Sequence, residues 1–168
     1  MITVDYARTM ARYNRWQNGS LYREAARLTD DERKLPRGAF FGSIHATLSH
    51  LLYGDQVWMS RFNAAPKPRA SSIKDSVAAY PDWVELSDAR GRLDDAMVAW
   101  ADALDPAWLD GELTWAPPAL GSRITRKRGL LVAHMFNHQA HHRGQVHCML
   151  TGFGMTPDDT DLPLMPVG

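Results

Sequence analysis

The amino-acid sequence predicts an all-α protein, a four-helix bundle with a small β-hairpin before its last helix. Four long segments place apolar residues at steps of three and four, which is the spacing of one helix face. Connections rich in proline, glycine and charge separate these segments. Before the last segment lies a stretch with two alternating pieces, which is typical of a hairpin. Four helices joined in this way pack as a bundle, and the chain is expected to form one domain over residues 1–168.

The first helix is expected over residues 3–28. Its apolar stripe contains Tyr6, Met10, Tyr13, Gln17, Leu21, Ala25 and Leu28. The stretch TDDERKLPRG at 29–38 ends this helix with charges, a proline and a glycine. A second helix is expected over residues 42–62, with Ser43 as its N-cap.

Residues 63–76 are rich in proline, serine and lysine, and they are expected to form a loop or a partly ordered connection. The helix that follows, over residues 82–104, has the clearest periodicity in the chain. Arg90 interrupts its apolar row, and Gly91 weakens the helix locally. The stretch DPAWLDG at 105–111 then begins a break in the helical pattern.

The β-hairpin is expected within GELTWAPPALGSRITRKR, residues 111–128. Two short alternating pieces flank Pro117–Pro118 and Gly121, which are residues that favour a turn.

The last long helix is expected over residues 128–151, closed by Gly152 and Gly154. It carries five of the chain's seven histidines. At about 100° per residue, one face of this helix gathers five polar side chains. They are His134, His138, His141, His142 and Gln145. His147 points to the opposite side and is expected to be solvated.

The i,i+4 pair His138 and His142 has the spacing that lets two imidazoles bind one metal ion. Two ligands hold an ion weakly, so a third is expected from a facing helix. His50 is the leading candidate because it lies mid-helix among leucines, where an unpaired imidazole is costly. His45, nearer the start of the same helix, is the alternative. The competing interpretation is that these histidines only make hydrogen bonds.

Two kinds of hydrolase do not fit the same residues. A zinc protease of the His-Glu-x-x-His type uses the glutamate as general base, but Gln139 follows His138 here. A serine hydrolase usually shows a Gly-x-Ser-x-Gly motif, which the sequence lacks. His134 and His141 are expected either to donate hydrogen bonds beside the ligands or to lie at the rim of the site. Cys148 is expected to be a small buried residue.

Composition indicates which partners and which cellular location are expected for the protein. Nineteen acidic and nineteen basic residues balance, which argues against a nucleic-acid surface. A single cysteine rules out an internal disulfide and suits a reducing cytosol. The sequence shows no signal peptide and no apolar run long enough to span a membrane, so a soluble cytoplasmic protein is expected.

Three motifs carry a family resemblance. They are YNRWQN at 13–18, HLLYGDQVW at 50–58 and NHQAHHRGQ at 137–145. Together with the closing GFGMTPDDTDLPLM, they occur in the order found in the DinB-like family, which includes the YfiT-like metalloenzymes. The sequence resembles that family over essentially its whole length.

The resemblance implies a four-helix bundle, often a homodimer, that binds a divalent metal, commonly zinc or nickel. The ligands it implies are His50, His138 and His142, and it prefers His50 over His45. Some relatives are thiol S-transferases or a thiol-dependent isomerase. The expected function is therefore a metal-dependent enzyme of thiol transfer, or of related lyase, isomerase or hydrolase chemistry. A small-molecule substrate and a low-molecular-weight thiol would be its reactants.

Two alternatives stay open on the sequence. The first is a non-catalytic metal-binding stress-response protein, which would use the same three histidines. The second is a dimerising helical scaffold without a metal. Arg143 and Gln145 match the family motif but receive no role from it, and His141 stands where relatives often have an aromatic residue.

Overall fold

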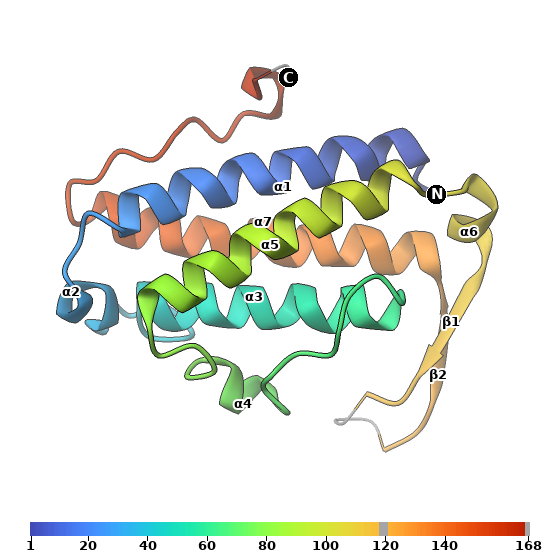
Figure 1. Ribbon diagram of the computed structural model, residues 1–168, viewed down its shortest axis with the longest axis horizontal. Coiled ribbons are helices and arrows are strands. Elements are labelled where there is room, and N and C mark those ends of the chain that lie inside the picture. Colours follow the sequence, from blue (N-terminus) through green and yellow to red (C-terminus); the bar gives the residue numbers. More distant parts are fainter. Residues whose placement is uncertain (118–120, 167–168) are drawn as a thin grey trace.

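In the computed structural model, which describes residues 1–117 and 121–166, four long helices lie side by side (Figure 1). They are α1 (Val4–Ala25), α3 (Ile44–Arg61), α5 (Trp83–Asp102) and α7 (Arg128–Thr151). Helix α1 packs against α5 and α7, and α3 packs against α7 and α5. This is the four-helix bundle that the sequence predicts, and each helix begins and ends within one turn of its predicted bounds.

Short helices occupy three of the stretches that connect the long helices. They are α2 (Asp30–Lys34), α4 (Ile73–Ser76) and α6 (Pro106–Asp110). Each begins at a side chain that accepts a backbone N–H: Thr29, Ser72 and Asp105, respectively. At α2 the cap is reciprocal, because Glu32 also accepts the backbone N–H of Thr29. The residues at 29–38 that end the first helix thus also contain a short helix of their own, and the connection at 63–76 ends in one turn of helix.

The predicted hairpin is present as β1 (Glu112–Trp115) and β2 (Ile124–Lys127). The strands are antiparallel and pair Glu112 with Lys127 and Trp115 with Ile124. Pro117 and Gly121 lie in the connection between them, and Pro118 lies outside the described residues. The hairpin packs onto the bundle through Trp115, whose ring makes an edge contact with the ring of Trp58 on α3.

The ends of two helices test the predicted capping residues. Ser43 is the N-cap of α3, and its hydroxyl accepts the backbone N–H of Ala46 at 3.2 Å. After α7, Gly152 keeps helical backbone angles, whereas Gly154 has a φ of 76°. Gly154 is therefore the residue that needs glycine's freedom, because L residues with side chains rarely adopt that angle.

Arg90, which breaks the apolar row of α5, lies inside the bundle with 3% of its surface exposed. Its guanidinium donates to Asp55 of α3 at 2.8 Å and to Asp94 of its own helix at 2.7 Å. Asn18 of α1 donates to the same Asp94 at 2.9 Å. The arginine is thus the centre of a buried polar network rather than a defect in the stripe.

After α7 the chain turns back and runs beside α1 to the C-terminal 3₁₀-helix Leu162–Leu164 (Figure 1). The Tyr13 hydroxyl donates to the carbonyl of Thr160 at 2.6 Å, and the Gln17 amide donates to that of Asp159 at 2.8 Å. Within residues 1–117 and 121–166, none of the helices combines the length and apolarity that a bilayer crossing needs.

Candidate metal centre

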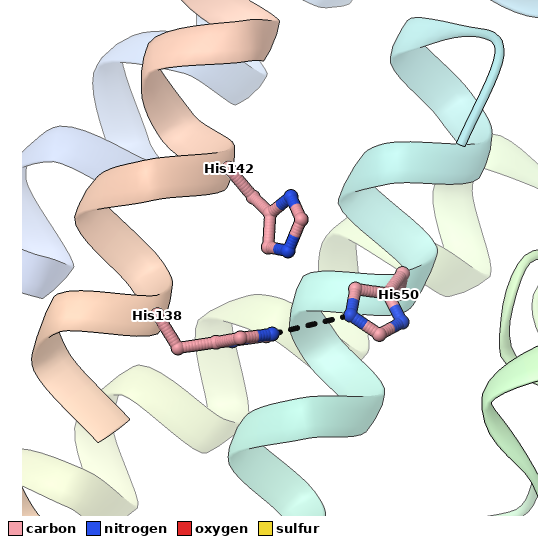
Figure 2. Close-up of side chains that lie close together, drawn as sticks. All are labelled: His50, His138 and His142. Carbon is pink, nitrogen blue, oxygen red and sulfur yellow. Dashed lines mark hydrogen bonds between the residues drawn. The ribbon is translucent and has the colours of Figure 1, made fainter. Parts of the chain in front are cut away.

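Three histidines converge between α3 and α7: His50 from α3, and His138 and His142 from successive turns of α7 (Figure 2). Each offers one ring nitrogen, and these three atoms lie within 4.8 Å of one another. The Nε2 atoms of His50 and His138 are 3.3 Å apart. The structure therefore brings together the three side chains that the sequence selects as metal ligands.

The proton of His50 is placed by a residue of α4. The Ser76 hydroxyl donates to the carbonyl of Ile73 at 2.6 Å, so its oxygen is left to accept. The Nδ1–H of His50 donates to that oxygen at 3.0 Å. With its proton on Nδ1, the ring presents an unprotonated Nε2 towards His138, which is the form that binds a metal.

His142 is oriented in the same way by its own helix. Its Nδ1–H donates to the Gln145 side-chain oxygen at 2.8 Å. The amide of Gln145 in turn donates to Nε2 of His141 at 3.3 Å. His141 thus orients the ligand His142 indirectly, by holding the side chain of Gln145 in place. Of the two roles expected for His141, it lies beside a ligand's partner, although its ring accepts a hydrogen bond there instead of donating one.

The contact between His50 and His138 fits a metal ion as well as a proton. Without an ion, a proton on Nε2 of His138 is donated to the unprotonated Nε2 of His50. With an ion, zinc–nitrogen bonds of about 2.0–2.1 Å in a tetrahedron place two nitrogens about 3.3 Å apart. Among the described residues the cluster contains no carboxylate or thiol, so the donor set is three imidazoles.

All three rings favour the neutral form. Burial, and then the neighbouring imidazoles, lowers the pKa of His138 to about 3. Burial, and then His142, lowers the pKa of His50 to about 4. Burial likewise lowers the pKa of His142. Neutral imidazole is the form that binds metal, so no proton has to be removed near neutral pH.

Two residues shape the space around the ligands. Phe41, in the turn before α3, stacks on His50 with ring centroids 3.8 Å apart and also lies 5.2 Å from His142. On the other side, Gly54 faces His138. A Cβ at position 54 would lie 3.0 Å from Cε1 of His138, so only glycine accepts the ring without a shift.

The alternative ligand His45 lies away from the cluster. It is buried, and its Nε2–H donates to the carbonyl of Tyr80 at 2.7 Å. Gln139 is also turned inward, with no exposed surface, and its amide donates to the carbonyl of Leu51. Even a glutamate at position 139 would therefore face the core, which agrees with the exclusion of protease chemistry.

The other three residues singled out from the sequence lie at the rim of the site, in a cavity and on the surface. His134 lies at the rim, with its ring 5.3 Å from that of Trp58 and 6.1 Å from that of His138. His147 is half-buried and lines a cavity of about 350 Å³ between α1 and α7, so it is less solvated than predicted. Cys148 is exposed, and the prediction that it is buried is wrong.

Ser76, Phe41 and Gly54 are the site residues that sequence reasoning missed. Ser76 falls in a stretch expected to be a loop, and nothing in its local pattern connects it to a histidine 26 residues earlier. Phe41 stands directly before the predicted helix, where an aromatic residue has many uses. Gly54, on the same face of α3 as His50 and one turn later, was the one signal available, since glycine inside a helix needs a reason.

Comparison with known proteins shows which family this chain resembles and supports its fold. The model of a family described as the DinB family matches residues 1–167. The protein called DinB of Bacillus subtilis strain 168 is 24% identical over 165 residues, which is 95% of this chain and 94% of that protein. A crystal structure of a DinB-like protein from Bacillus cereus ATCC 10987 superposes with a TM-score of 0.59 at 17% identity. It covers 86% of this chain and 90% of the other, and at that identity it supports the fold alone.

Proposed function

Because this chain belongs to the DinB family, and three of its histidines converge between α3 and α7, we propose that it is a metal-dependent enzyme. The proposed ligands are His50, His138 and His142. The observation that carries the proposal is that Ser76 and Gln145 hold the protons of two ligands on Nδ1. Partners of this kind fix the tautomer and orientation of metal-binding histidines.

A zinc or nickel ion held by three imidazoles would supply a Lewis acid whose open coordination positions acidify a bound water or thiol. Other residues of the chain shape the surroundings of the three histidines. Gly54 leaves room for the ring of His138, and Phe41 excludes water from one face of His50. His138 is only half-buried, so the cluster is accessible from its side.

The chemistry we propose is transfer of a low-molecular-weight thiol to an electrophilic small molecule, with lyase, isomerase or hydrolase reactions as related possibilities. A thiol at neutral pH is a weak nucleophile because it is mostly protonated, and its thiolate form reacts. Three-ligand coordination suits this need because it leaves positions for the thiol. The family and the site support metal dependence, and the identity of the reaction rests on the resemblance.

A non-catalytic metal-binding protein is the second candidate, and one observation favours it. Phe41 stacks directly on His50, as a residue that closes a structural site would. Turnover separates the two candidates. Zinc- or nickel-loaded protein is expected to accelerate the reaction of a low-molecular-weight thiol with an activated halide. Loaded protein that accelerates no such reaction, nor hydrolysis or isomerisation, would leave the binding protein as the better explanation.

The metal site itself is tested by elemental analysis of untagged protein. We expect about one divalent ion per chain in the wild type, and loss of most of it in both His50→Ala and His142→Ala, because each removes one of three ligands. His147→Ala is the matched control, since it removes a histidine from the opposite face of α7. Metal content that both ligand substitutions leave unchanged would refute the site.

A further inference from the structure

Arg61 lies in the last turn of α3, eleven residues after His50. At about 100° per residue it shares a helix face with His50, and helical side chains lean towards the N-terminus. The guanidinium accordingly lies over the ring of Trp58, 4.6 Å from its centroid, and 5.6 Å from the centroid of Trp115. Arg61 therefore extends back along α3 towards the three histidines, between α3 and the hairpin.

The charge of Arg61 has no anionic partner in the part of the chain that the structure describes. Within residues 1–117 and 121–166, no carboxylate lies within 4.0 Å of its guanidinium and no hydrogen bond from it is made. The side chain is half-buried, and this loss of solvent lowers its pKa. The buried Arg90 is a clear contrast, since it has two carboxylates. A desolvated cation without a counter-ion is costly, which makes the place favourable for an anion.

Aromatic rings connect this cation to the three histidines. The ring of Trp58 lies 5.3 Å from that of His134, and His134 lies 6.1 Å from His138. The Arg61 guanidinium, the rings of Trp58 and His134, and the candidate metal centre therefore follow one another between α3 and α7.

We propose that Arg61, with Trp58 and Trp115, binds the carboxylate of an elongated organic acid whose other end reaches the three-histidine centre. The inference deepens the proposed function and rests on it for the reactive end. By helix rise, the level of Trp58 is about 12 Å along α3 from His50. That distance is about the length of three or four residues of extended peptide, and it excludes small acids such as acetate.

The anion subsite is tested first without any metal. Octanoate and octan-1-ol are titrated into the protein, and the indole N–H signals of Trp58 and Trp115 are followed by NMR after assignment with Trp→Phe variants. We expect both signals to move, with octanoate binding roughly tenfold more tightly than the alcohol because of one charge-assisted contact. Arg61→Gln should abolish that preference, and Arg61→Lys should keep most of it.

The matched control is Arg92→Gln, which removes an exposed arginine of α5 and should leave the preference unchanged. Equal binding of acid and alcohol, or a preference that survives Arg61→Gln, would overturn the proposal. A second arm uses zinc-loaded protein with 8-mercaptooctanoate and 8-mercaptooctan-1-ol, measured by calorimetry. Thiol binding without preference for the acid refutes the subsite and spares the metal site, whereas absence of zinc refutes the metal site and leaves the octanoate result standing.

Discussion

At the scale of single residues, the three candidate ligands are held by different means. His50 and His142 each donate an Nδ1–H to a fixed oxygen, on Ser76 and Gln145. His138 has no such bond among the described residues, and its ring is placed by close packing against the backbone at Gly54. The position of the His138 ring therefore depends on residue 54 having no Cβ.

Gly54→Ala should separate stability from metal binding. Alanine is the better residue inside a helix, by up to about 1 kcal/mol, so the free energy of unfolding of the metal-free protein should rise or stay unchanged. The new methyl group displaces the ring of His138, so metal affinity should fall by roughly tenfold or more, as when an orienting partner is lost. Urea unfolding and competition with a chelator measure the two quantities.

Gly91→Ala is the control for this substitution, because a Cβ at position 91 of α5 meets no atom within 4 Å. It should give the gain in stability and no change in metal affinity. If Gly54→Ala bound metal as tightly as Gly91→Ala does, close packing at position 54 would not be what places His138.

At the scale of secondary-structure elements, the short helix α4 acts as a support for α3. Ser72 caps its start, and the chain then presents Ser76 to two successive residues of α3. The Ser49 hydroxyl donates to the Ser76 carbonyl at 2.6 Å, while His50 donates to the Ser76 hydroxyl. Helix α4 is a single turn, too short to be stable alone, and these two bonds fix it where Ser76 sets the orientation of His50.

Ser76→Ala should weaken metal binding with little effect on the fold. It removes the oxygen that accepts the Nδ1–H of His50, and loss of such a partner usually lowers metal affinity by about 10–100-fold. Ser71→Ala is the matched control, because Ser71 is exposed and, in the described part of the chain, its hydroxyl bonds only Asp75. Affinity is measured by chelator competition on both variants. Equal affinities would show that the serine does not orient the ligand.

At the scale of the whole molecule, a buried polar network ties the helices together. Asp55 comes from α3, Arg90 and Asp94 from α5, and Asn18 from α1. Burial raises the pKa of Asp94 to about 6, against the opposing effect of Arg90. The network specifies how the helices pack, at the cost of desolvating charge in the centre of the bundle.

The raised pKa of Asp94 predicts a pH dependence of stability. Between the ordinary value of 3.8 and about 6, the folded protein holds a proton that the unfolded chain releases. This contribution to stability is therefore present at low pH and lost as pH rises through 6. On going from about pH 7.5 to about pH 5, wild-type protein should gain unfolding free energy relative to Asp94→Asn.

Urea unfolding at the two pH values measures this difference, and comparison with the variant cancels the titration of the histidines. Asp95→Asn is the control, since Asp95 is an exposed neighbour that pairs with Arg15 at 3.5 Å. Its difference from the wild type should not change over this range. A wild-type advantage over Asp94→Asn that does not grow at low pH would contradict the raised pKa.

The sequence by itself determined the features that depend on neighbours along the chain. The helix periods, the Ser43 cap, the hairpin and the i,i+4 pair of His138 and His142 follow from helix and strand geometry, which repeats within a few residues. The motif order added the family and the choice of His50 over His45. That the protein is a homodimer stays a prediction from the same resemblance.

Only the tertiary structure decided what meets across the bundle. His50 and His138 are 88 residues apart in the chain, and His50 and Ser76 are 26 apart, so no local pattern reveals either contact. The same holds for Arg61, because its lack of a counter-ion among the residues that the structure describes is visible only when every neighbouring element is in place. The sequence states which side chains are present, but packing sets the distances between them and how far each is removed from water. A metal centre or an anion site depends on both of these quantities.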